Sequence, residues 1–172
     1  MNRIRRLLTV FVLPVEVIGV MVGSALSAPA LADTVTRQLL LKATNIQFTS
    51  FTCLNDACSL ALATLAGDAT SNLSAGGTGT FQTTITVDFS PGGDCNIVDE
   101  PGVFTFDNGT IFTHSHHEDC LTHGLRIDTT FQVTGGAGAF SGATGSGREF
   151  GAVSGFAQSA HNPAIFVGTI SF

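Results

Sequence analysis

The stretch FQVTGGAGAFSGATGSG, from Phe131 to Gly147, decides the fold. Its first residues alternate between apolar and polar side chains, which is the pattern of a β-strand with two different faces. Glycines then become frequent, and glycine permits the positive φ that a tight reversal requires. We therefore expect a strand, a glycine-rich corner and the start of a second strand.

The same alternation recurs along the chain and is clearest over residues 80–89, where Phe81, Ile85 and Val87 share one face. Further strands are expected at residues 36–52, 59–66, 103–106, 111–114, 125–133, 148–159 and 164–172. Glycine, proline and asparagine separate them, which predicts an all-β domain. A closed antiparallel β-barrel of about eight strands leaves no strand edge unpaired. A two-sheet β-sandwich is the alternative.

The first 32 residues have the features of a secretory signal peptide. Arg3, Arg5 and Arg6 precede an apolar run, and the small-residue pattern of residues 30–32 suits cleavage after Ala32. A membrane anchor is the alternative, but Glu16 would be costly in lipid. We expect a secreted protein with one barrel domain at residues 33–172 and no stable membrane span after cleavage.

Residues 33–172 are strongly acidic. They contain four lysines and arginines against twelve aspartates and glutamates, which gives 4 − 12 = −8. Phosphate backbones bind basic surfaces, so nucleic acid is not expected as a partner. The sequence predicts no oligomeric state.

An Asn-Gly pair lies between two alternating runs at residues 103–114 and predicts a β-hairpin. With Asn108 and Gly109 at the centre of the turn, Phe106 is expected opposite Ile111. Phe104 is then expected opposite Thr113.

The four cysteines all follow the signal peptide, and an even number in an exported chain indicates disulfides. A turn at Asn55-Asp56 would place Cys53 opposite Cys58. In the hairpin register Cys95 and Cys120 are diagonal neighbours, and one bulge near residues 101–102 would bring them opposite. We therefore predict the pairs Cys53–Cys58 and Cys95–Cys120. Metal ligation is the alternative, but no C-x-x-C spacing is present.

The corner resembles the V-x-G-G-T-G-x-F-x-G-A-x-G corner of the allene oxide cyclase and dirigent protein barrels. The match covers residues 133–145, and Ala137 stands where threonine is usual. Matching positions are Gly135, Gly136, Gly138, Phe140, Gly142, Ala143 and Gly145. We expect positive φ at the first three glycines, a plug of the barrel end by Phe140, and a close backbone approach at Gly142.

The resemblance implies a barrel cavity but assigns no catalytic residue, because it is confined to the corner. Dirigent proteins steer the coupling of phenoxy radicals, and the cyclases close a fatty-acid epoxide. This chain has no tyrosine or tryptophan, so an aromatic hydroxyl has no candidate in the pocket. The catalytic residues therefore stay unknown, and no cofactor is expected.

The fourteen phenylalanines either fill the barrel or line a pocket for a small apolar ligand, and the sequence leaves both open. Our leading interpretation is a secreted, disulfide-stabilised, non-catalytic barrel that binds such a ligand. The alternative is a cyclase- or dirigent-like enzyme acting on an apolar substrate. An enzyme would need ionisable groups that face inward, and the candidates are Asp88, Arg126, Asp128 and Arg148.

The densest polar cluster is His114-Ser-His-His-Glu-Asp-Cys120. His114 and His116 share a strand face, as metal ligands on a strand would. The hairpin places them on the face opposite Phe104, so we expect a solvated outer face and favour no metal. The acidic pairs at residues 99–100 and 118–119 are expected in turns, as surface charge.

Overall fold

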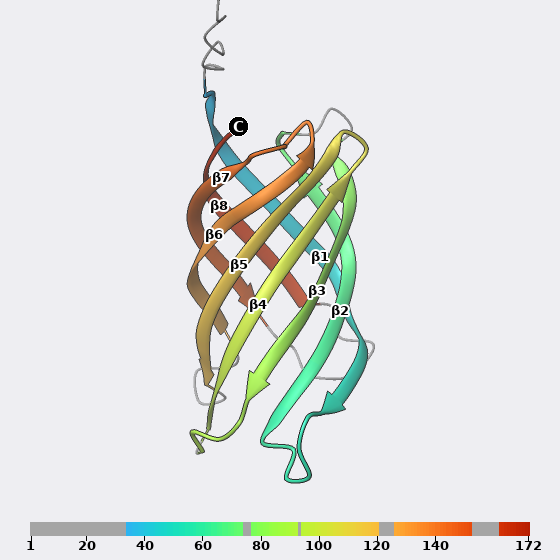
Figure 1. Cartoon of the computed structure of the whole chain (residues 1–172), viewed down its shortest axis with the longest axis vertical. Helices are drawn as coiled ribbons and strands as arrows, with labels where there is room; N and C mark the ends of the chain where they lie inside the picture. The colour runs from blue at the N-terminus through green and yellow to red at the C-terminus, as the bar shows by residue number, and fades with distance from the viewer. Residues whose placement is uncertain (1–33, 74–76, 93, 121–125, 153–161) are drawn as a thin grey trace, which may run out of the picture. The chain divides into compact units, whose positions relative to one another are not determined.

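The computed structural model describes residues 34–73, 77–92, 94–120, 126–152 and 162–172. They form the strands β1 (Thr36–Cys53), β2 (Leu60–Ser71), β3 (Thr78–Asp88), β4 (Cys95–Phe106), β5 (Gly109–Cys120), β6 (Arg126–Gly138), β7 (Thr144–Ala152) and β8 (Asn162–Ser171). Each strand is antiparallel to the next, and β8 pairs with β1 (Figure 1). The expected closed eight-stranded barrel is confirmed.

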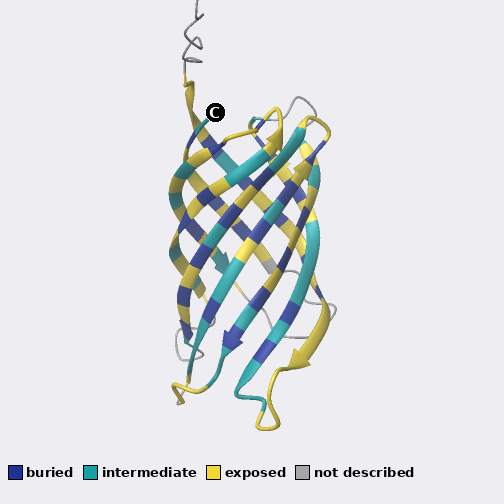
Figure 2. Cartoon of the chain, in the orientation of Figure 1, coloured by how far each residue is buried: buried dark blue, intermediate teal, exposed yellow. Residues whose placement is uncertain are grey.

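Buried and exposed residues alternate along the strands (Figure 2). On β3, Phe81, Ile85 and Val87 are buried, whereas Gln82 and Thr84 are exposed. Successive side chains of a strand point to opposite faces, so the apolar half of the pattern faces the barrel interior. In the described ranges, no helix has the length and apolar character that a membrane crossing requires.

Aromatic rings fill one half of the interior. Phe104 lies 4.8 Å from Phe81 and 5.1 Å from Phe166 between ring centroids, and Phe131 lies 5.2 Å from Phe166. These four side chains are fully buried. Tilted and edge-to-face arrangements at such distances are favourable for aromatic pairs.

Phe140 closes the end of this half, as expected. It is 1% exposed and lies 6.5 Å from the Phe106 ring and 5.6 Å from the Phe172 ring. The β4–β5 hairpin and the β6–β7 turn lie at the same end (Figure 1).

The glycine-rich corner differs from the expectation in detail. Strand β6 continues through Gly138, and among the expected corner glycines only Gly138 and Gly142 have positive φ, at 64° and 76°. Gly135 and Gly136 lie within the strand. A Cβ at Gly136 would lie 2.3 Å from the carbonyl oxygen of Phe140, so this glycine permits a close approach of the chain. Gly142 has open space around it, so the close approach expected there is wrong.

The β4–β5 hairpin is shifted by two residues from the expected register. Phe106 pairs with Gly109, and Phe104 pairs with Ile111, so the turn residues are Asp107 and Asn108. A Cβ at Gly109 would lie 2.3 Å from the carbonyl oxygen of Ala137 on β6, which explains why the glycine occupies the ladder. A shift by two residues leaves every side chain on its expected face.

Both expected disulfides are present. Cys95 pairs directly with Cys120 in the β4–β5 ladder with a Cα–Cα distance of 4.0 Å, so no bulge is needed. Cys53 is bonded to Cys58 across 4.8 Å. The ladder partner of Cys53 is nevertheless Ala61, so the direct opposition expected there is wrong.

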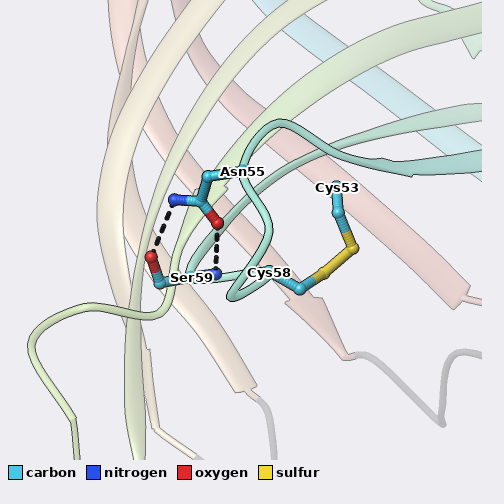
Figure 3. The surroundings of a disulfide bond; sticks show 4 residues. All are labelled: Cys53, Asn55, Cys58 and Ser59. Atoms are coloured by element: carbon cyan, nitrogen blue, oxygen red, sulfur yellow. Dashed lines mark hydrogen bonds between the residues drawn. A yellow bond between two sulfur atoms is a disulfide. The ribbon is translucent and has the colours of Figure 1, made fainter.

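Residues 54–59 form a loop that its own polar groups stabilise (Figure 3). The Asn55 side chain donates from Nδ2 to the Ser59 hydroxyl and accepts from the Ser59 backbone N–H, both at 2.9 Å. The backbone N–H of Cys58 donates to the Asn55 carbonyl.

Several strands are longer than expected. Strand β2 does not stop at Ala66, because Gly67 and Asp68 pair with Phe81 and Thr80 of β3. Strands β4 and β5 extend to the disulfide, so the acidic pairs lie in strands and not in turns. The expected signal peptide, Asp33, Leu125 and residues 153–159 of an expected strand lie outside the described residues.

Candidate functional site

A cavity occupies the other half of the barrel, away from Phe140. It comprises about 710 Å³ of space free of protein atoms, including the part that opens to solvent. Its walls are mostly apolar and include Ile46, Leu65, Ile85, Val87, Val98 and Ile127. The sequence left open whether the phenylalanines fill the barrel or line a pocket. The structure shows a filled interior in one half and a cavity in the other.

Two adjacent strands place acidic and imidazole groups in this cavity. On β4, Glu100 lies on the same inward face as Val98 and Phe104. On β5, His117 and Asp119 lie on the same inward face as Ile111. Alternate positions of a strand share a face, so the pattern that buries the aromatic residues also buries these polar groups.

Strand β7 contributes a further acidic residue, Glu149, to the cavity lining. The other positions on its inward side are the glycines Gly145, Gly147 and Gly151, so Glu149 is the one inward side chain over residues 144–151. A Cβ at Gly147 would lie 2.7 Å from the Phe131 ring and 2.1 Å from the Val167 carbonyl oxygen. Gly147 thus makes room for the ring, and Glu149 is among the residues that line the cavity.

Glu149 is fully buried, at 0% exposure. Neither of its carboxyl oxygens has a hydrogen-bond partner among the described residues, nor has the Ser115 hydroxyl. Burial raises the pKa of Glu149. The Ser115 hydroxyl and the charge of His117 act in the opposite direction, and the charge of Asp119 adds to the rise.

Glu100 faces the same cavity, and burial raises its pKa well above the ordinary value. The charges of Glu149 and Asp119 raise this pKa further. The Nε2 atom of His117 lies 3.3 Å from a carboxyl oxygen of Asp119, and both side chains are nearly buried. The cavity therefore contains carboxyls that favour the protonated form next to an imidazole–carboxylate pair. Such a set can bind polar groups or transfer protons.

The sequence-based candidates for inward charges lie elsewhere. Asp128 and Arg148 form an ion pair on the outer face, and Arg126 is exposed. Asp88 is half-buried outside the cavity, and hydrogen bonds from the Ser90 side chain and backbone lower its pKa. The four candidates are on the wrong face, because the strand residues that alternate with them carry the buried side chains.

His114 and His116 lie on the outer face, as expected. The Nε2 atom of His114 is 2.8 Å from a carboxyl oxygen of Asp99, and the Nδ1 atom of His116 is 3.7 Å from the same oxygen. Cys95, Glu118 and Cys120 also lie together. Both of those sulfurs are in the disulfide, however, and therefore offer no thiolate to a metal.

The alternation in the sequence also indicates the cavity residues, provided that the strands are extended beyond their expected ends. The acidic pairs at residues 99–100 and 118–119 lie on the two strands of the hairpin and not in turns beyond it. Extending the hairpin alternation from Phe104 assigns Glu100 to the inward face, and extending it from Ile111 assigns His117 and Asp119 to that face. The alternation Gly-x-Gly-x-Glu-x-Gly over residues 145–151 marks Glu149 in the same way.

No protein-family model and no curated protein sequence matches this chain. Among solved structures, the chain is similar to a pterocarpan synthase dirigent protein at 11% identity and a TM-score of 0.47, over 80% of this chain and 85% of that one. It is also similar to pyocyanin demethylase at 15% identity and a TM-score of 0.42, over 77% of this chain and 99% of that one.

Proposed function

We propose that this protein is a secreted barrel that binds one small, mostly apolar molecule in its cavity. The observation that carries the proposal is the division of the interior. Phenylalanines pack one half, whereas apolar side chains surround an open space in the other. A space with apolar walls and a few convergent polar groups is the usual form of a small-molecule site.

The secretion part of this proposal is supported by the signal-peptide pattern and by the two disulfides, which persist in oxidising compartments. Expression of the full chain in an exporting host should yield a protein that begins at Asp33, as measured by intact mass. A cell-retained protein that keeps residues 1–32 contradicts this part.

Binding can be tested with N-phenyl-1-naphthylamine, an uncharged apolar dye whose fluorescence rises in apolar surroundings. Val87→Phe should lower the affinity at least about tenfold, because the added ring occupies the cavity. The control Val167→Phe adds the same ring on the outer face, where Val167 is 44% exposed, and should bind as the wild type does.

Equal affinities of the two variants would contradict binding in the cavity. Ile85→Phe tests the same wall at a second position, in case Val87→Phe folds poorly. Circular dichroism of each variant separates loss of binding from loss of the barrel.

A second candidate function is acid–base catalysis on the bound molecule. The observation in its favour is the presence of carboxyls with raised pKa and the His117–Asp119 pair in one cavity. A proton-transfer site exchanges carbon-bound hydrogens of its substrate with D₂O, and NMR detects this exchange. The exchange should be lost in Glu149→Gln and kept in Glu118→Gln, whose position faces outward. A bound molecule that shows no exchange removes this candidate.

A further inference from the structure

The ionisable groups that line the cavity include more acids than bases. Three carboxyls, those of Glu100, Asp119 and Glu149, face one imidazole, that of His117. The described residues that line the cavity include no lysine or arginine. Even with a charged imidazole, the site has more acidic groups than basic ones, so ionisation of these carboxyls would give it the same sign as the net negative charge of residues 33–172.

The buried oxygens of Glu149 accept no hydrogen bond from the described residues, although the nearby Ser115 hydroxyl lowers the pKa of Glu149. Both are inaccessible to solvent and without a hydrogen-bond partner among the residues that the structure describes. A buried polar group without a partner costs about 1–3 kcal/mol, and more when it is charged. A molecule that supplies donors at this point therefore gains the stabilisation that the protein itself does not provide.

We propose that the ligand carries a positively charged nitrogen, such as a protonated amine, which donates hydrogen bonds to Glu149 and Glu100 while its apolar body packs on the cavity walls. This inference rests on the proposed binding function and specifies its ligand class. An ammonium group offers three N–H donors. Hydrogen bonds between an ammonium and a carboxylate are about twice as strong as neutral ones.

Binding of a cation is coupled to loss of a proton. In the free protein the surroundings favour the protonated form of Glu149, which Glu100 of β4 and His117 and Asp119 of β5 surround together with the Ser115 hydroxyl. The ammonium ion meets a carboxylic acid, the acid O–H bond breaks, and the proton passes to the buffer, which leaves an ammonium–carboxylate pair. The affinity for the cation should therefore rise with pH until Glu149 is ionised in the free protein, and then become constant.

Three probes of one shape test the charge: 1-naphthylmethylamine, 1-naphthylmethanol and 1-naphthoate. By titration calorimetry at neutral pH, the amine should bind at least about tenfold more tightly than the alcohol. The naphthoate should bind most weakly. Calorimetry in two buffers of different ionisation enthalpy should show release of a proton with the amine only.

The outcomes separate the two proposals. Equal binding of the three probes, or tightest binding of naphthoate at low pH, overturns the preference for a cation and leaves the binding function standing. If neither these probes nor the apolar dye binds, both proposals are overturned.

Variants test the residues. Glu149→Gln retains the side-chain shape but removes the negative charge, so the amine should lose its advantage over the alcohol and its proton release. Glu118→Gln, the same change on the outward side of β5, should keep both. Glu100→Gln is the second cavity variant if Glu149→Gln does not fold. Wild-type affinity for the amine in both cavity variants overturns the inference.

Discussion

The charge of Glu149 raises the pKa of Glu100, although their strands β7 and β4 are three places apart in the order of the barrel. Both carboxyls line the cavity because alternate side chains of each strand face the interior, where burial weakens the screening of their charges by solvent. Two acids that face one apolar cavity both favour the protonated form, and this preference links folding to pH.

The stability of the barrel should fall as the pH rises above the ordinary value of 4.5 for glutamate. In the unfolded chain Glu149 loses its proton near that value, whereas in the barrel it keeps the proton to a higher pH. The unfolded state then binds fewer protons, so the free energy of unfolding decreases with pH. Glu149→Gln should therefore gain stability over the wild type between pH 4 and pH 8, as measured by urea unfolding. Glu118→Gln, the same change on the exposed side of β5, is the control, and a pH-independent difference for Glu149→Gln contradicts the argument.

Two adjacent glycines of β6 should respond very differently to the same substitution. A Cβ at Gly136 would lie 2.3 Å from the Phe140 carbonyl oxygen, whereas the nearest atom to a Cβ at Gly135 is 3.5 Å away, on Phe112. Gly136→Ala should cost about 1–3 kcal/mol or more, because backbone must move. Gly135→Ala should change the free energy of unfolding by less than about 1 kcal/mol. Equal effects would show that the turn adapts to the added methyl group.

Removal of a ring from the packed half should cost far more than removal of one from the outer face. Phe104 is fully buried between Phe81 and Phe166, so Phe104→Ala should destabilise by about 3–5 kcal/mol. Phe112→Ala deletes the same atoms from a position that is 38% exposed and should cost less than about 1 kcal/mol. Urea unfolding measures both, and a small effect at Phe104 would show that this half of the barrel is loosely packed.

The two disulfides should contribute unequally to stability. The Cys95–Cys120 bond spans 25 residues and the Cys53–Cys58 bond spans five. Loss of loop-closure entropy in the unfolded chain gives about 3.5 kcal/mol for the longer loop and about 2 kcal/mol for the shorter one. The double variants Cys95→Ala/Cys120→Ala and Cys53→Ala/Cys58→Ala should rank in that order in urea unfolding. The opposite order would show that the loop at residues 54–59 matters beyond chain entropy.

The sequence predicted the barrel because alternation is a local property. Residues 80–89 show which face is apolar without reference to any other strand, and the hairpin alternation correctly placed His114 and His116 outside. Registers were less predictable, since they depend on contacts between strands. Gly109 looked like a turn residue, but its contact with Ala137 on β6 keeps it in the ladder.

The cavity residues were hidden for a related reason. Charged residues at a strand end look like surface charge unless the strand is known to continue, and the Cys95–Cys120 pair fixes that continuation for β4 and β5. Glu149 is recognisable once the glycines that alternate with it are assigned to the inward face, and the structure explains one of them, because a Cβ at Gly147 would meet the Phe131 ring of the neighbouring strand. The division of the interior into a packed and an open half depends on side chains from every strand, so no single stretch contains it.

Val35 and Phe172 exchange two backbone hydrogen bonds, of 3.2 and 3.3 Å, beside the end that Phe140 closes. Phe172 therefore lies at the end of the barrel that Phe140 closes (Figure 1). A tag or surface linker added after Phe172 would hold the protein by this side. The half with the cavity would then face the solution.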